Sequence, residues 1–96
     1  MKMIKKILIA NRGEIALRIQ RTAHDMGIRT VALYTLGEER APHVMNSHES
    51  VFLGNGPLSE TYLNVDKIID AAKITSADAV HPGYGFLSEN PLLAEA

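Results

Sequence analysis

Two polar loops carry the side chains in this sequence that could do chemistry. Residues 11–14 (N-R-G-E) follow one short apolar run, and residues 81–90 (H-P-G-Y-G-F-L-S-E-N) follow another. Both runs have the composition of buried parallel strands, and ligands of open α/β sheets bind beyond the carboxyl ends of such strands. We therefore expect the two loops to lie at the same sheet edge and to form the rim of a binding site.

The first loop offers a cation, a carboxylate and an amide. Gly13 permits a tight turn from strand to helix, the Arg12 guanidinium is a planar donor fork for a carboxylate or phosphate, and Glu14 suits a helix start. Asn11, Arg12 and Glu14 are therefore candidates for ligand contact or for ion pairs between domains, and both readings stay open. The missing G-x-G-x-x-G pattern argues against a dinucleotide site.

The second loop places a tyrosine between two glycines. Gly83 and Gly85 would leave backbone N–H groups accessible, and the Tyr84 phenol could donate or accept a hydrogen bond. Such a loop could cradle an oxyanion or a polar ring, although an ordinary glycine-rich connection fits equally well. We interpret His81 as a hydrogen-bonded structural histidine rather than a base, because no acid or nucleophile stands beside it.

Metal chemistry has no support in the residue pattern. The chain has no cysteine, and its four histidines show no ligand-type pairing. The sequence predicts no metal site.

The elements that would position these loops follow from apolar patterning. The expected strands are residues 6–10, 30–35, 50–54 and 77–81, and the expected helices are residues 14–26 and 65–75, with a helical turn over 41–46 and another helix starting at Asn90 and Pro91. Gly27 should end the first long helix, and Asn64 should cap the second. Alternating strands and helices predict an α/β fold with a Rossmann-like parallel sheet of about four strands flanked by helices.

Apolar spacing predicts a buried stripe on each long helix. These stripes are Ile15, Ile19, Ala23 and Met26 on the first helix, and Val65, Ile68, Ile69, Ala72 and Ile74 on the second. One core is expected from Ile15, Ile19, Ile68, Ile69 and Ala72 of the helices with Ile7, Leu8, Ile9, Val31, Leu33, Val51, Leu53 and Val80 of the strands.

Length and charge narrow the function classes. At 96 residues and 46% hydrophobic content, the chain suits one small domain. Residues 1–30 carry seven Lys and Arg against two acids, whereas residues 31–96 carry three against nine. The acidic remainder, the short basic runs and the few aromatic residues argue against nucleic-acid binding. The apolar run after the basic start is too short for a signal peptide or a membrane span, so we expect a cytoplasmic protein.

The loops and strands together resemble a known family. Residues 6–16, 27–32, 62–64 and 77–90 are similar, in order and spacing, to the N-terminal domain of biotin carboxylases, with I-A-N-R-G-E-I-A and H-P-G-Y-G-F-L-S-E-N as the most specific stretches. Residues 36–59 depart from the family pattern. The resemblance implies a pre-ATP-grasp domain over residues 1–96, in a fragment of a longer chain.

The resemblance also implies the chemistry of the whole enzyme. ATP activates bicarbonate, with Mg²⁺, and the carboxyl group passes to biotin on a carrier protein or domain. No catalytic residue is expected in residues 1–96, which should be inactive and bind no cofactor tightly without the ATP-grasp domains. The resemblance places Tyr84, Gly85 and Gly83 at the biotin-pocket edge, and Arg21 and Asp25 at a homodimer contact.

Two points stay open at this level. The final acceptor could be acetyl-CoA, propionyl-CoA, pyruvate or urea. Two other classes of function also fit the chain: a Rossmann-like module that binds a nucleotide or other anion, and an interaction domain without catalytic activity.

Overall fold

The computed structural model describes residues 4–82 and contains one four-stranded sheet. The elements run β1 (Lys6–Ile9), α1 (Gly13–Asp25), β2 (Arg29–Thr35), α2 (Pro42–Met45), β3 (Glu49–Gly54), a 3₁₀ turn (Leu58–Glu60), α3 (Val65–Thr75) and β4 (Ala79–His81). The expectations for Gly83, Tyr84, Gly85 and the helix start at Asn90 lie outside the described residues.

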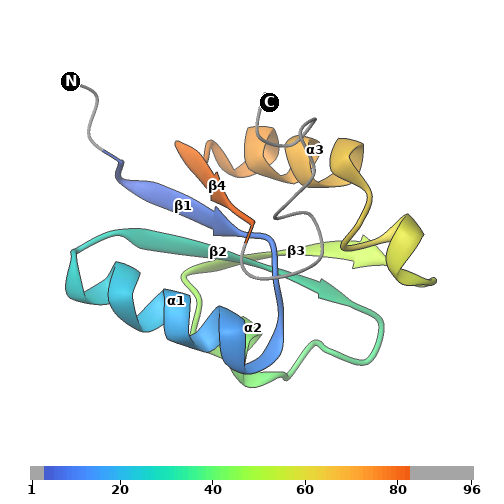
Figure 1. Cartoon of the computed structure of the whole chain (residues 1–96), viewed down its shortest axis with the longest axis horizontal. Helices are drawn as coiled ribbons and strands as arrows, with labels where there is room; N and C mark the ends of the chain where they lie inside the picture. Colours follow the sequence, from blue (N-terminus) through green and yellow to red (C-terminus); the bar gives the residue numbers. More distant parts are fainter. Residues whose placement is uncertain (1–3, 83–96) are drawn as a thin grey trace.

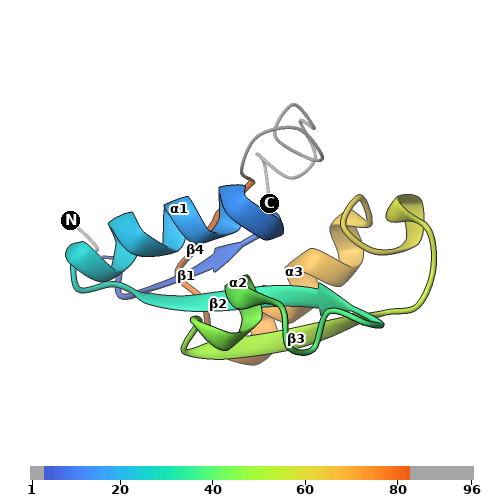
Figure 2. The ribbon, with the colours of Figure 1, turned by 90° about the horizontal axis from the view of Figure 1, so that it is seen from below.

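The sheet is parallel throughout, with strand order β3-β2-β1-β4. Figure 1 shows α1 and α2 along one face and α3 along the other, and Figure 2 shows α3 beyond the strands when the sheet is viewed from the side of α1 and α2. Along the chain, the strands are added in one direction from β1 to β3, and β4 is then added on the other side of β1. Right-handed crossovers therefore require α3 to lie on the face opposite α1 and α2. The predicted α/β class and four-stranded parallel sheet are confirmed.

The end of α1 shows why glycine was a correct stop signal. Gly27 has φ +75°, its N–H donates to the His24 carbonyl at 3.0 Å, and the Ile28 N–H donates to the Ala23 carbonyl at 2.8 Å. This pair of bonds is the Schellman closure, which requires a left-handed residue at the glycine position. Met26 therefore lies beyond the last helical residue.

The predicted stripe on α1 was partly wrong. Its buried residues are Ala16, Gln20 and Ala23, whereas Met26 is 69% exposed. Ile15 and Ile19 lie beside the buried line and are only half-buried. The buried line includes a polar residue, Gln20, so a search for apolar residues alone did not find it.

The second long helix begins as expected and ends without a glycine. The Asn64 side chain accepts the Lys67 N–H at 3.1 Å, which confirms the predicted cap. Ser76 closes the helix at φ 59°, a left-handed conformation that ordinary residues rarely adopt. Ile74 was wrongly placed in the buried stripe: it is 77% exposed because the buried line runs through Ile68, Ala71 and Thr75.

The main hydrophobic cluster lies between the sheet and α3. Its members are Leu8, Ala10, Val31, Leu33, Leu53, Tyr62, Ile68 and Ala71. Side chains alternate between the two faces of a strand, so the neighbours Ile7 and Ile9 on β1 lie on the α1 face instead. The single core expected from the sequence is thus two layers, and the layer under α3 is the larger cluster.

Candidate functional site

The two candidate loops begin side by side at the carboxyl edge of the sheet. β1 ends at Ile9 and β4 at His81, which are register partners in adjacent parallel strands. The pairing continues one step further, because the Ala10 N–H donates to the His81 carbonyl at 2.8 Å. The chain therefore starts residues 11–14 and the segment after Pro82 from neighbouring points, which supports the expected shared edge. Gly83 itself lies outside residues 4–82.

Asn11 shapes the turn that follows β1. It is 2% exposed, and its Oδ1 accepts the Arg12 N–H at 2.8 Å. A buried amide that bonds to the next backbone group fixes the direction in which the chain leaves the strand. The structure thus gives Asn11 a positioning role, and directs the following side chain outward.

Arg12 is a partly exposed cation at this edge. Its guanidinium carbon lies 5.5 Å from the centre of the Tyr62 ring, and its Nη1 lies 3.6 Å from Glu38 Oε2. The Arg12 side chain is 44% exposed. A cation held over a ring and beside a carboxylate, with one side open to solvent, is suited to contact a further polar or anionic group.

Glu38 is held by four hydrogen-bond contacts, counting the one from its own backbone N–H. Its Oε1 accepts from the Thr35 N–H at 2.8 Å, the Thr35 hydroxyl at 2.7 Å and the Tyr62 hydroxyl at 3.1 Å, while the Glu38 N–H donates to the Thr35 carbonyl at 3.0 Å. Partial burial acts to raise the pKa of Glu38, but the Thr35 and Tyr62 hydrogen bonds and the nearby Arg12 charge outweigh it and lower that pKa. Glu38 is therefore a carboxylate at neutral pH.

Tyr62 connects this network to the core. It is fully buried, and its hydroxyl lies 2.9 Å from the Leu33 carbonyl as well as near Glu38. Burial, followed by the charge and hydrogen bond of Glu38, raises the pKa of Tyr62 far above its usual value. The phenol therefore stays neutral and acts as a hydrogen-bond donor.

Sequence reasoning missed Glu38 and gave Tyr62 no role at the site. Glu38 falls in residues 36–59, where the family pattern offered no guidance, and its contact with Arg12 is a tertiary one. A local signal was nevertheless present: Thr35 and Glu38 have the Thr-x-x-Glu spacing of a capping box. Here they form a turn instead, in which the Glu38 carboxylate accepts the Thr35 N–H and the Glu38 N–H donates to the Thr35 carbonyl.

The other predicted contact residues lie on the surface of α1. Glu14 is exposed in the first turn, and Arg21 and Asp25 are exposed one turn apart near the far end. The structure does not bring Glu14 together with Arg12 in an ion pair among the described residues. These three side chains remain accessible for contact with another domain or chain.

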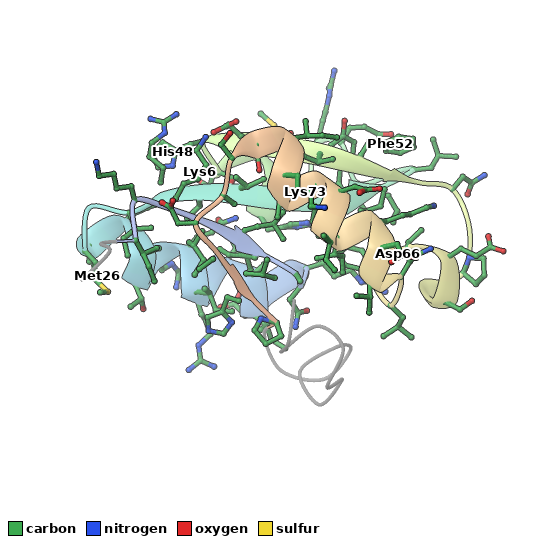
Figure 3. The ribbon with its side chains drawn as sticks, turned by 90° about the horizontal axis from the view of Figure 1, so that it is seen from above. Lys6, Met26, His48, Phe52, Asp66 and Lys73 are labelled. Carbon is green, nitrogen blue, oxygen red and sulfur yellow. The ribbon has the colours of Figure 1, made fainter. Side chains whose placement is uncertain are left out.

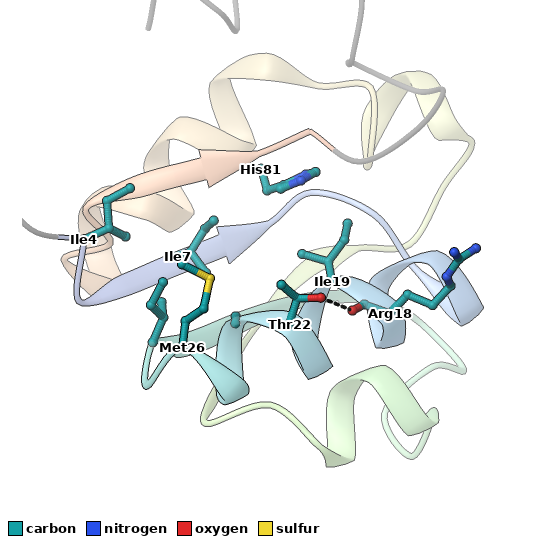
Figure 4. A pocket seen from close by; sticks show the side chains of 9 residues that line it. Ile4, Ile7, Arg18, Ile19, Thr22, Met26 and His81 are labelled. Carbon is teal, nitrogen blue, oxygen red and sulfur yellow. Dashed lines mark hydrogen bonds between the residues drawn. The ribbon is translucent and has the colours of Figure 1, made fainter.

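An apolar groove lies along α1, on the face of the sheet opposite the main cluster. Its volume is about 490 Å³, and Figure 4 shows Ile7 and Ile19 facing it, with Met26 and Ile4 at one end and His81 and Arg18 at the other. Within residues 4–82, this groove leaves apolar side chains of β1 and α1 partly open.

Two classes of site are not formed by the described part of the chain. Within residues 4–82, no three His, Cys, Asp or Glu side chains are grouped so as to hold a metal ion. No helix in the same range is long and apolar enough to cross a bilayer.

Comparisons with known proteins agree with the motifs. The family described as "Biotin carboxylase, N-terminal domain" matches residues 3–96. Biotin carboxylase 2 of Bacillus subtilis is 53% identical over 93 residues, which are 97% of this chain and 21% of that protein. The crystal structure of Kluyveromyces lactis urea carboxylase superposes with TM-score 0.92 at 50% identity, covering 96% of this chain and 8% of that one.

A second similar structure carries a ligand. The biotin carboxylase domain of a thermophilic 2-oxoglutarate carboxylase, bound to bicarbonate, has TM-score 0.92 and 49% identity and covers 98% of this chain and 21% of that one. The chain thus spans about a fifth of the length of the biotin carboxylases it matches.

Proposed function

The chain belongs to the biotin carboxylase N-terminal domain family, and we propose that it forms the site-lining first domain of an ATP- and bicarbonate-dependent biotin carboxylase. The observation that carries this proposal is the family match over residues 3–96, which includes both loops that leave neighbouring strands. The parent enzyme would carboxylate biotin on a carrier protein or domain, in the cytoplasm.

The chain's own residues fit a supporting part in that chemistry. Phosphoryl transfer needs several positioned cations. Within residues 4–82, the carboxyl edge has Arg12, which is partly exposed, and Lys67, whose Nζ already donates to the Leu53 carbonyl at 2.9 Å. We therefore assign ATP, Mg²⁺ and the catalytic groups to the ATP-grasp domains that follow in a full-length enzyme. The bicarbonate bound to the similar 2-oxoglutarate carboxylase domain supports bicarbonate as a substrate here.

We place the biotin-pocket edge at Tyr84, Gly85 and Gly83. These residues come directly after β4, whose last residue, His81, pairs with Ile9 at the carboxyl edge. The adjacent first loop supplies Asn11 to fix the turn and Arg12 to meet an anionic or polar group of the following domains. Glu14, exposed in the first turn of α1, is the other candidate for such an interdomain contact.

We further propose that the full-length enzyme is a homodimer that uses the exposed side of α1. Arg21 and Asp25 are four residues apart on this helix and both are exposed. Their opposite charges allow reciprocal pairing across a two-fold axis, as isologous interfaces require. The apolar groove beside the same helix extends the surface available for burial.

The assignment is tested by measuring bicarbonate-dependent ATP hydrolysis and carboxylation of free biotin. We expect both activities in the full-length protein and neither in the 96-residue chain, because the chain lacks the groups that transfer phosphate. Bicarbonate-stimulated ATP hydrolysis by the purified 96-residue chain would contradict the assignment of the catalytic groups to the ATP-grasp domains. A full-length protein inactive with bicarbonate and biotin would contradict the proposed reaction.

A further inference from the structure

At the amino edge of the sheet, a histidine ring accepts a backbone hydrogen bond that a carbonyl of the neighbouring strand would ordinarily accept. His48 immediately precedes β3, and its N–H donates to the Thr30 carbonyl at 3.1 Å. In return, the Thr30 N–H donates to Nδ1 of the His48 ring, also at 3.1 Å. Thr30 of β2 is thus paired with His48 through one backbone bond and one side-chain bond.

This pairing fixes the protonation of the ring. An N–H group can donate only to a nitrogen with a free lone pair, so Nδ1 of His48 carries no proton and the neutral ring carries it on Nε2. Protonation would place a second N–H opposite the Thr30 N–H. The new Nδ1 proton could turn to the Thr30 hydroxyl, 3.3 Å away, but the Thr30 N–H would lose its acceptor.

The groups around His48 also disfavour a positive ring. The His24 ring of α1 stands edge-on at 4.9 Å, with its Nε2 3.0 Å from the Thr30 hydroxyl. His48 is exposed, but desolvation by its neighbours, then the charges of Arg29 and His24, lower its pKa despite the opposing charge of Glu49.

The nearby acid is already engaged. Glu49 Oε2 lies 2.6 Å from Lys6 Nζ of β1, and Figure 3 shows Lys6 and His48 at the same end of the molecule. The remaining polar neighbour is Ser47, whose hydroxyl donates to the Thr30 hydroxyl at 3.0 Å. The acid that could stabilise a protonated His48 is therefore Glu49, and Glu49 is already paired with Lys6.

We propose that His48 is an acid-sensitive latch, which holds the Thr30 amide at the start of β2 only while its imidazole is neutral. The bond between the His48 ring and the Thr30 amide makes the amino edge respond to mildly acidic pH, at which ordinary backbone pairing does not change. The response is local, because the bond that is lost belongs to one amide, that of Thr30.

The first test is ¹⁵N NMR of the 96-residue chain across pH 7.5 to 5. We expect His48 to show the Nε2–H tautomer at pH 7.5, and to titrate below the ordinary value of about 6.5. As it titrates, hydrogen-exchange protection of the Thr30 amide should fall by about fivefold to tenfold, the equivalent of one ordinary hydrogen bond. An Nδ1–H tautomer at pH 7.5, or unchanged Thr30 protection through the titration, would overturn the latch.

The second test replaces the ring by an acceptor that does not titrate in this range. In His48→Asn, the side-chain oxygen can accept the Thr30 N–H at every pH, so Thr30 protection should become independent of pH between 7.5 and 5. The matched control, His24→Asn, removes the neighbouring ring but leaves His48, and should keep the pH dependence. The proposal fails if His48→Asn keeps the wild-type dependence or if His24→Asn abolishes it.

Discussion

The two edges of this sheet use polar residues in different ways. At the carboxyl edge, buried or partly buried groups, chiefly Tyr62 and Glu38, hold one cation, Arg12, with part of its surface open. At the amino edge, charged groups join neighbouring strands: Oδ2 of Asp78, just before β4, accepts the N–H groups of Lys5 and Lys6 at 2.8 and 3.0 Å.

The same contrast extends to lysine and arginine. Lys6 Nζ donates to the Thr75 carbonyl at 2.7 Å and pairs with Glu49, which ties β1 to the end of α3 and to β3. Arg12, at the other edge, stands at the N-cap position of α1, but its side chain makes no capping hydrogen bond. The amino edge thus ties strands together through charged side chains, whereas the carboxyl edge leaves one cation, Arg12, partly open to solvent.

The largest expected effect is on Tyr62, the buried support of the carboxyl edge. Tyr62→Ala should lower the free energy of unfolding by about 3–5 kcal/mol, since it empties a fully buried aromatic site. Tyr62→Phe keeps the ring and should lower it by about 1 kcal/mol through the lost hydroxyl. Urea unfolding of the 96-residue chain measures both, and equal losses for the two variants would show that ring packing is not what supports this edge.

A smaller loss is expected at the amino edge. Asp78→Ala removes the carboxylate that accepts two backbone N–H groups and should lower the free energy of unfolding by about 1–3 kcal/mol. Asp70→Ala, at an exposed position on α3, is the matched control and should change it by less than about 0.5 kcal/mol. Asp78→Ala with no more effect than Asp70→Ala would mean that the amino edge is not fastened by this residue.

The smallest stability effect is expected for Glu38, with a distinct pH dependence. Because the folded-state pKa of Glu38 is lowered, its contribution is complete above the unfolded-state pKa of about 4.3 and is lost as pH falls through the folded-state value. Glu38→Gln should lower the free energy of unfolding by about 0.5–1 kcal/mol at pH 7 and reduce its decline below pH 4.5. Glu39→Gln, beside it and exposed, should leave both unchanged. A decline below pH 4.5 that Glu38→Gln leaves unaltered would contradict the lowered pKa of Glu38, which comes from the Thr35 and Tyr62 hydrogen bonds and the Arg12 charge.

The sequence predicted the fold well because the fold depends on local patterns. Apolar runs, Gly27 and Asn64 marked the strands and helix ends, and all four parallel strands formed within two residues of their expected bounds. Met26 and Ile74 were misplaced because apolar type alone does not reveal where a helix ends or how it is rotated against the sheet.

The site was harder to predict because its geometry is tertiary. Asn11 and Arg12 were found from their position after β1, but the partners that hold Arg12 come from the loop after β2 and from the segment before α3. Arg12 is 26 residues from Glu38 and 50 from Tyr62 in the sequence, so only the folded sheet brings them together. The acceptor role of His48 likewise depends on the reach of its ring across to β2.

The central claim, that this domain lines the biotin pocket of a carboxylase, is tested most directly by biotin-dependent ATP turnover of the full-length protein carrying Tyr84→Phe. If the Tyr84 hydroxyl touches biotin, its loss should reduce that rate by up to about tenfold, or about 0.5–1.5 kcal/mol, with little change in melting temperature. Tyr34→Phe on β2, whose ring packs against Phe52, is the matched control and should leave the rate unchanged. A Tyr84→Phe enzyme that melts at a lower temperature yet responds to biotin like the wild type would place Tyr84 outside the site and contradict the claim.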